Sequence, residues 1–303
     1  MPDGVDIREN DLRKIDGGRV LEILLKCHYT CAKTPLHSGN VGKTRNIIWA
    51  SDSYAGHKPT EQIKIEDITD RTIERGGQAV IAGALKGLLI QPRAAKSKDE
   101  QTRRTKDKAE VFTPLNVVKA MNDAVDRAMG EDLPDGWTWR DFVRSPRLEI
   151  TCGEAPFIVS RYDPLSGKIQ KPVRRVGFLD RKLQVVSKYC DAPGEWLDVA
   201  REAFRASYGY EWAGDNLLLA RENFLYSLWE FYRDKFAGAD CETFAQFYKT
   251  IGSERVGEFA EVVSWNVWQM DGLKNTLPMD GGKFAVVMDW ELGRAVKFAD
   301  LLN

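Results

Sequence analysis

The chain has 303 residues, of which 43% are hydrophobic and 29% charged, so it has the material for a buried core and is neither a disordered tail nor a disulfide-stabilised miniature. Lys plus Arg number 44 and Asp plus Glu 45, a net charge of −1, so any basic surface must be local. The longest near-apolar stretch, 79–90, contains Lys86 and is far shorter than the ~20 residues that a membrane-spanning helix needs. We therefore expect no membrane partner.

Two features predict a cytoplasmic location. The first twenty residues mix acids and bases and contain no apolar segment of the kind that secretory signals have. The five cysteines are odd in number and scattered, which is typical of reduced thiols. Cys27 and Cys31 lie four apart in a segment expected to be helical, so we interpret them as core thiols and predict no metal site.

The N-terminal third is expected to be mostly helical. Apolar spacing predicts a helix over 15–33 and one or two short helices over 65–89, interrupted at Gly76-Gly77. The segment 91–108 is rich in Lys and Arg and poor in large apolar residues, so we expect a domain boundary or an exposed loop. It is interpreted either as a solvated linker or as a contact to DNA phosphates, with Arg93, Lys96, Lys98, Arg103 and Arg104 as the candidate DNA-binding residues.

The remainder reads as alternating helices and strands. Helices are predicted over 114–129, 196–204 and 217–236, strands over 147–151, 175–180, 208–212 and 262–268, and a hairpin over 284–298. Strands that alternate with helices indicate an α/β fold with a mainly parallel sheet. We therefore expect two domains, a smaller, mostly helical or mixed one over 1–108 and an α/β domain over 109–303.

Three chemically distinctive residues follow predicted strands. Gly153 lies in a turn after the first strand of the second domain, Glu211 ends a later strand, and Asp271 follows the next. Ligands of open parallel sheets collect at the carboxyl ends of strands. A glycine turn lets backbone amides approach a ligand, and the two acids can accept hydrogen bonds from ribose hydroxyls and an exocyclic amine. Together they predict a nucleoside pocket, in which Asp180 is a rival to Glu211 for the ribose.

Four segments, in order, resemble N6-adenine DNA methyltransferases of the restriction-modification type. They are Ala109-Glu-Val-Phe-Thr-Pro114, which is similar to the family's FTP motif; Leu148-Glu-Ile-Thr-Cys-Gly-Glu-Ala-Pro-Phe157, similar to its methionine-binding loop; Tyr208 to Leu225, similar to its strand-acid-helix segment; and Asn266-Val-Trp-Gln-Met-Asp-Gly-Leu273, similar to its adenine-binding segment. The resemblance covers about 109–273 and implies a Rossmann-like methyltransferase sheet that binds S-adenosylmethionine. The cofactor-binding residues that it implies are Phe112, Thr113, Pro114, Glu149, Thr151, Cys152, Gly153, Phe157, Glu211, Trp212 and Asp271.

One part of the family pattern is absent from this sequence. The family transfers the methyl group with a D/N/S-P-P-Y/F/W tetrapeptide, which grips the flipped adenine, and no such tetrapeptide occurs here. We therefore assign no catalytic residue to this chain and expect a partner chain to supply the tetrapeptide and the target-recognition domain, with the hairpin at 284–298 as a docking element. The alternative is a non-catalytic, DNA-binding or regulatory relative of these enzymes.

Overall fold

A computed structural model describes residues 9–31, 42–54, 56–75, 78–82, 90–131, 136–236 and 241–302. The chain forms two compact units, each built from separate segments. The first contains Gln91–Gly209 and Glu222–Gly252, and the second contains Ile7–Ile90, Tyr210–Arg221 and Ser253–Asn303. This division differs from the expected one at residue 108, because the N-terminal and C-terminal segments share one sheet.

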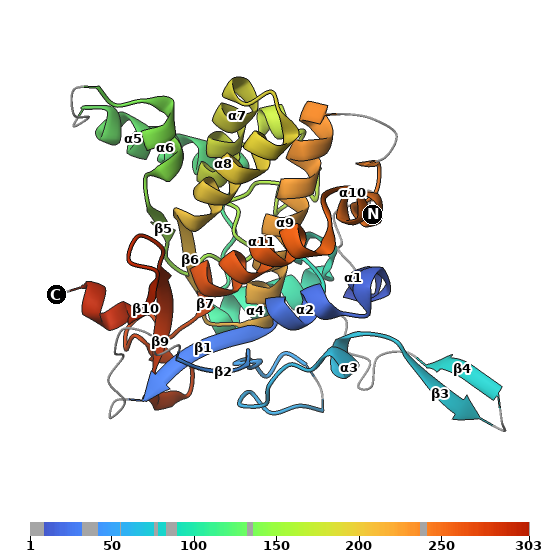
Figure 1. Cartoon of the computed structure of the whole chain (residues 1–303). Helices are drawn as coiled ribbons and strands as arrows, with labels where there is room; N and C mark the ends of the chain where they lie inside the picture. Colours follow the sequence, from blue (N-terminus) through green and yellow to red (C-terminus); the bar gives the residue numbers. More distant parts are fainter. Residues whose placement is uncertain are drawn as a thin grey trace. The chain divides into compact units, whose positions relative to one another are not determined.

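The first unit is mostly helical (Figure 1). Within it, α6, α7 and α8 pack on one another. Its elements are η1 (Arg93–Ala95), α4 (Lys98–Lys108), α5 (Leu115–Glu131), α6 (Trp139–Arg144), β5 (Arg147–Glu149), η2 (Pro172–Arg174), α7 (Phe178–Tyr189), α8 (Pro193–Arg205), the start of β6 (Ser207–Glu211), the larger part of α9 (Gly214–Phe236) and α10 (Phe244–Ile251).

Strands β5 and β6 form a small parallel sheet. Arg147 pairs with Ser207, Leu148 with Tyr208 and Glu149 with Gly209. The chain between them contains α7 and α8, as a parallel connection requires. At the end of β6, in the second unit, the Met270 amide donates to the Glu211 carbonyl at 3.1 Å, and β7 (Val267–Gln269) is the next strand of this sheet.

The second unit contains a larger, antiparallel sheet in the order β10-β9-β1-β2, with β8 also paired to β9. Tyr29 of β1 pairs with Ala285 of β9, so the sheet joins residues from opposite ends of the chain. Besides β7 and the parts of β6 and α9 that belong to it, the elements of this unit are α1 (Glu9–Asp16), α2 (Arg19–Leu24), β1 (Lys26–Cys31), β2 (Lys43–Asn46), α3 (Ile65–Ile68), β3 (Arg71–Arg75), β4 (Gln78–Ala82), α11 (Ser253–Asn266), β8 (Thr276–Leu277), β9 (Asp280–Asp289), β10 (Arg294–Lys297) and η4 (Phe298–Leu301).

Helix α11 provides the core of the second unit. It packs against α2 and against strands β9 and β1 of the antiparallel sheet. Trp265 near its C-terminal end is buried with Val286 and Ala295, and its indole stacks on the His28 ring at a centroid distance of 3.5 Å. Burial of this imidazole, followed by the nearby charges of Arg221 and Lys26, lowers the pKa of His28 to about 3. His28 is therefore neutral and structural.

The mixed α/β class is confirmed, but the larger sheet is antiparallel, and the Rossmann-like sheet remains an expectation. The predicted helices over 114–129, 196–204 and 217–236 correspond to α5, α8 and α9. The strands predicted at 147–151 and 208–212 are β5 and β6, and the predicted hairpin is formed by β9 and β10. The hairpin is part of the chain's own sheet because β9 also pairs with β1.

Four element predictions were wrong over at least part of their length, although α2 lies within 15–33, α3 lies within 65–89 and β7 overlaps 262–268. The segment 15–33 ends in β1, where Cys27 is a buried strand residue, because the strand gains a distant partner in β9. The residues on either side of Gly76-Gly77 form the antiparallel strands β3 and β4, since β-branched residues suit paired strands. Gly76 and Gly77 themselves lie outside the described residues. The segment 175–180 opens α7, and 262–266 ends α11.

Candidate functional site

The turn after β5 has an unusual backbone. Thr151, Gly153 and Ala155 all have positive φ, of 52°, 56° and 66°, and alternate with residues of negative φ. The Ala155 amide donates to the Cys152 carbonyl at 2.7 Å and closes the turn. Left-handed residues are costly without a glycine, and turns of this kind gather successive backbone N–H groups into anion-binding concavities. The turn is therefore the strained element in the region where the sequence predicted ligand binding.

Phe112 lies against this turn. A β-carbon on Gly153 would be 3.8 Å from the Cε1 and Cζ atoms of the Phe112 ring, and the ring is buried. The Arg93 guanidinium lies 5.0 Å from the ring centroid, in cation–π contact. The structure thus brings together two predicted site residues that are 41 positions apart in the sequence, together with a third residue that we had assigned to DNA.

Gly209 allows the turn to pack directly on β6. A β-carbon at this position would lie 2.9 Å from Cδ1 of Ile158 and 3.3 Å from Sγ of Cys152. Cys152 is buried, so its thiol serves the packing of the turn on the strand. The β6 strand then continues for two residues to Glu211, which places a carboxylate at its carboxyl end.

The other predicted residues of the first unit lie around the same turn or next to it. Glu149 is the last residue of β5, pairs with Gly209 and is half-buried. Thr113 and Pro114 are half-buried, and the Pro114 carbonyl accepts from the amides of Val117 and Val118 in the first turn of α5. The Phe157 carbonyl accepts from the Asn122 side chain at 3.0 Å, which ties the far end of the loop to α5.

In the second unit, Glu211 and Asp271 lie at the ends of neighbouring strands. Both residues are buried, with 8% of each exposed. The Glu211 side chain accepts from the Ala213 amide at 3.0 Å, ahead of α9, and Asp271 accepts from the Leu273 amide at 3.0 Å. Both acids are thus oriented by short-range hydrogen bonds at the carboxyl ends of their strands.

Trp212 contacts a segment with a cluster of aromatic residues that the sequence analysis missed. Its indole donates to the Ala50 carbonyl at 2.8 Å, and the segment around Ala50 contributes Trp49, Tyr54 and His57. The Trp49 and His57 rings stack at 4.7 Å, and the Tyr54 hydroxyl donates to Asp215 at 2.9 Å. This aromatic cluster lies beside the N-terminus of α9 in the second unit. Its residues show no helical or strand spacing, so only their aromatic character could have indicated it.

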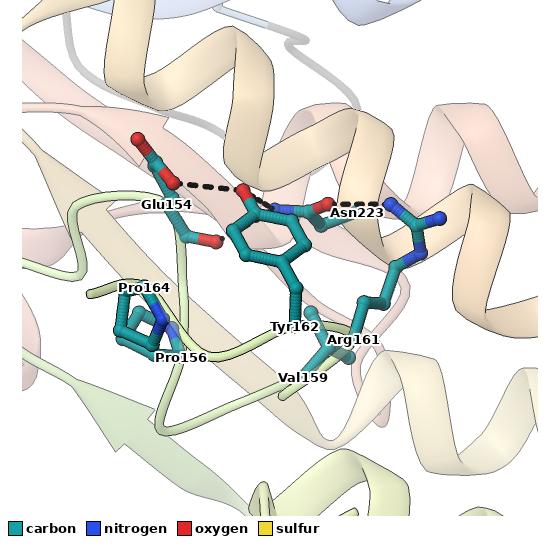
Figure 2. Close-up of a pocket in the computed structure, with 7 residues that line it drawn as sticks. All are labelled: Glu154, Pro156, Val159, Arg161, Tyr162, Pro164 and Asn223. Carbon is teal, nitrogen blue, oxygen red and sulfur yellow. Dashed lines mark hydrogen bonds between the residues drawn. The ribbon is translucent and has the colours of Figure 1, made fainter. Parts of the chain in front are cut away.

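A small pocket in the first unit is lined by a buried polar network (Figure 2). The Tyr162 hydroxyl donates to the Glu154 carboxylate at 2.7 Å, and the Asn223 amide donates to the Glu154 carbonyl at 3.0 Å. Burial raises the pKa of Glu154, and the charge of Lys96 opposes this effect. Burial and the neighbouring Glu154 raise the pKa of Tyr162 well above its usual value. Glu154 therefore holds the turn on α9.

The network continues to a buried carboxylate between two arginines. Arg161 donates to Asn223 at 3.0 Å and to both oxygens of Glu230, at 3.0 and 2.9 Å, and Arg175 also pairs with Glu230. Burial alone would raise the pKa of Glu230, but the two guanidinium groups outweigh it and lower the pKa to about 2. The arrangement is a structural anchor of α9.

Asp180, the rival for the ribose role, is placed elsewhere. It is fully buried in the first turn of α7, where its Oδ2 accepts from the Ser160 amide at 2.6 Å and from the Gly177 amide at 3.2 Å. Burial raises its pKa to about 6, against the opposing charge of Arg175 and these hydrogen bonds. Its surroundings are those of a helix cap.

The segment 91–108 is not an exposed loop, because η1 and α4 are formed within it. Arg104 is buried and pairs with Glu110 at 2.9 Å and Glu100 at 3.4 Å, and Lys96 is buried as well. Of the five candidate DNA-binding residues, only Lys98 and Arg103 are exposed, while Arg93 is half-buried on Phe112. Internal ion pairs thus account for Arg104, and the contact with Phe112 accounts for Arg93.

Comparison with protein-family models, with curated proteins and with solved structures finds no match for this chain. Among the helices of the described residues, none combines the length and apolar character that crossing a bilayer demands.

Proposed function

We propose that this chain is the S-adenosylmethionine-binding subunit of a DNA N6-adenine methyltransferase of the restriction-modification type. The observation that carries the proposal is the packing of Phe112 on Gly153, directly after β5. The two residues belong to the two segments that resemble the family's FTP motif and methionine loop. If the two segments resembled the family by chance, there would be no reason for them to lie together at the end of a strand. Ligands of parallel sheets bind at this place.

The chemistry of the residues present fits the cofactor. In the first unit, the turn at Gly153 would supply backbone amides to the methionine part, with Phe112 as an apolar wall. The resemblance assigns Glu211 to the ribose hydroxyls and Asp271 to the adenine amine, and a carboxylate has the hydrogen-bond acceptors that these groups need. Trp212 is 37% exposed and offers an aromatic surface beside Glu211. The cofactor would supply a methyl group on a sulfonium, which an adenine N6 can accept.

The target adenine would be bound by a second chain. The sequence has no D/N/S-P-P-Y/F/W tetrapeptide, and this chain therefore orients the donor but does not grip the acceptor base. The same partner would carry most of the DNA contact. The burial of Lys96 and Arg104 supports this division, because it removes two of the five basic residues from a possible phosphate-binding surface.

Calorimetric titration of the whole chain with S-adenosylmethionine tests the proposal. We expect binding that weakens by about tenfold in Glu211→Gln and in Asp271→Asn, since each loses a charge-assisted hydrogen bond to the ligand. Both variants keep the oxygen that accepts from a neighbouring amide. Asp280→Asn, which changes a partly exposed carboxylate paired with Lys283, is the matched control and should bind normally. Lack of cofactor binding by the folded chain, alone and with its partner, would refute the proposal.

A further inference from the structure

Gln269 is a buried amide that joins three parts of the second unit. It is the last residue of β7 and is 0% exposed. Its Nε2 donates to the carbonyls of Ile48 and Trp212, at 2.7 and 2.9 Å, and its Oε1 accepts from the Ile48 amide at 2.9 Å. Both amide hydrogens and the oxygen are therefore used, which fixes the side chain and its partners in one geometry.

The segment around Ala50 is bonded to the start of α9 through successive carbonyls. The Trp49 carbonyl accepts from the Gly214 amide at 3.0 Å, and the Ala50 carbonyl accepts from the Trp212 indole at 2.8 Å. A β-carbon on Gly214 would lie 2.1 Å from the Ile48 carbonyl oxygen, so only glycine lets α9 begin this close to the segment. The segment, from the N-terminal part of the sequence, is thus an integral part of the region that follows β6.

Trp212 is held at both ends. Gln269 fixes its carbonyl, and Ala50 fixes its indole nitrogen. Ala50 is itself held, because its backbone is left-handed with a φ of 53° and its amide donates to the Pro59 carbonyl at 2.7 Å. Yet 37% of Trp212 is exposed. Since its nitrogen is already bonded, the indole offers its ring to a ligand in a fixed orientation, which lowers the entropy cost of stacking.

Two carboxylates lie on the same strand ends. Glu211 directly precedes Trp212, and Asp271 follows Gln269 by two residues. The Met270 amide donates to the Glu211 carbonyl at 3.1 Å, so the ends of β6 and β7 are joined directly. An aromatic ring on strand ends that also carry carboxylates suits a nucleoside, which offers a flat base for stacking and N–H and O–H donors for the acids.

We propose that Gln269 and the Ala50 carbonyl are positioning groups, which hold the Trp212 indole where it stacks on the base of a purine nucleoside bound at the ends of β6 and β7. The inference rests on the proposed function, in which this nucleoside is the adenosine of S-adenosylmethionine. The resemblance assigned a role to Trp212 but none to Gln269 or to the segment around Ala50. Both groups act on the ligand through the indole.

Calorimetric titration with S-adenosylmethionine and with adenosine tests this role, on the full chain or on its complex with the partner if only the complex binds. Gln269→Met removes all three hydrogen bonds of the amide, and Trp212→Ala removes the ring. We expect each to weaken the binding of both ligands by about tenfold. The double variant should bind no more weakly than Trp212→Ala alone, because Gln269 acts only through the ring.

Gln184→Met is the matched control. The Gln184 amide also donates to two carbonyls, those of Pro172 and Arg175, both at 2.9 Å, but it lies in the first unit. Both Gln→Met variants lose hydrogen bonds of the folded chain, so a lower unfolding midpoint is expected in each. Only the affinity separates them, and it should be unchanged in Gln184→Met.

Trp212→Phe decides the question if Gln269→Met does not fold. It changes an exposed residue, keeps an aromatic ring and loses the bond to the Ala50 carbonyl, so we expect binding about three- to tenfold weaker. Unchanged affinity in Trp212→Phe or in Gln269→Met would overturn the proposal. So would a loss from Gln269→Met that is equally large in the presence and in the absence of the Trp212 ring.

The same titrations distinguish this inference from the proposed function. Binding of S-adenosylmethionine that is weakened by Glu211→Gln and Asp271→Asn but not by Gln269→Met would leave the function standing and refute the positioning role. Binding of adenosine with the expected coupling between Gln269 and Trp212, without binding of S-adenosylmethionine, would do the reverse. Binding of neither ligand, by the folded chain alone and with its partner, would refute both.

Discussion

The ring of Phe112 lies against the α-carbon of Gly153, so that a β-carbon on this glycine would meet the ring at 3.8 Å. That distance is an ordinary contact, and the need for glycine comes instead from the backbone, whose φ of 56° is left-handed. In the turn after β5, the effect of a substitution on backbone strain can therefore be measured separately from its effect on ligand binding.

Gly153→Ala is expected to lower the free energy of unfolding by about 1–2 kcal/mol, the cost of a left-handed conformation for a residue with a β-carbon. Urea denaturation measures the change. Gly130→Ala is the control: Gly130 lies in α5 with open space around it, and the substitution should raise stability by about 0.5 kcal/mol. Equal effects at the two positions would contradict this account.

Thr151→Gly is expected to stabilise the protein by about 0.5–1 kcal/mol. Thr151 is exposed and β-branched, and it has a φ of 52°, so glycine relieves strain that outweighs the extra freedom of the unfolded chain. Thermal unfolding would show the gain as a higher midpoint. Thr151→Ala keeps a β-carbon and should leave the midpoint nearly unchanged; a similar gain in that variant would argue against backbone strain.

Glu230→Gln is expected to cost about 3–5 kcal/mol at pH 7, because it leaves two buried guanidinium groups without a carboxylate. The pKa of Glu230 is lowered to about 2, so its stabilisation is present above the unfolded pKa and is lost as pH falls through 2. The difference between wild type and variant should therefore shrink in acid. Glu202→Gln, which changes an exposed ion pair with Arg144, should cost less than about 1 kcal/mol.

Asp180 should make stability depend on pH in the opposite sense. Its folded pKa of about 6 exceeds the ordinary value of 3.8, so the folded state holds the proton more tightly. Its contribution is present below pH 4 and is lost as pH rises to 6, by on the order of 3 kcal/mol. Denaturation of Asp180→Asn across this range should lack that decline. A variant that follows the wild-type curve would show that Asp180 does not titrate there.

Arg104→Ala is expected to destabilise the chain by about 3–5 kcal/mol, since it leaves Glu110 nine-tenths buried beside a cavity. Arg103→Ala should change stability by less than about 0.5 kcal/mol. If DNA binding can be measured for the complex, the joint Lys98→Ala and Arg103→Ala variant should reduce the salt dependence by about 1–2 units of slope. A stable Arg104→Ala variant with altered DNA binding would restore the original interpretation.

The sequence predicted those elements whose own residues show regular apolar spacing. Helix α8 and strand β6 were predicted because their apolar spacing is regular over their whole length. Strand β1 was not, because its partner β9 lies near the other end of the chain and no local pattern reveals such pairing. The segment 262–266 is rich in β-branched and aromatic residues, yet it is helical since α11 covers the antiparallel sheet.

The candidate site divides in a similar way. Phe112 and Gly153 were each selected from a segment that resembles the family, and their contact was not itself predicted. The role of Arg104 was not predicted either, because a basic residue in a charged run looks the same in a sequence whether it pairs internally or contacts DNA. The cluster of Trp49, Tyr54 and His57 was missed because it forms only through the irregular path of its segment.

The pairing of Tyr29 with Ala285 also determines when the antiparallel sheet can form during protein synthesis. During synthesis β1 leaves the ribosome long before β9 is made. The edge of β1 that pairs with β9 therefore stays unpaired until β9 has emerged. The antiparallel sheet can close only after β9 has been synthesised. A premature stop that removes β9 would leave β1 exposed, and chaperones or proteases would meet the product as an aggregation-prone fragment.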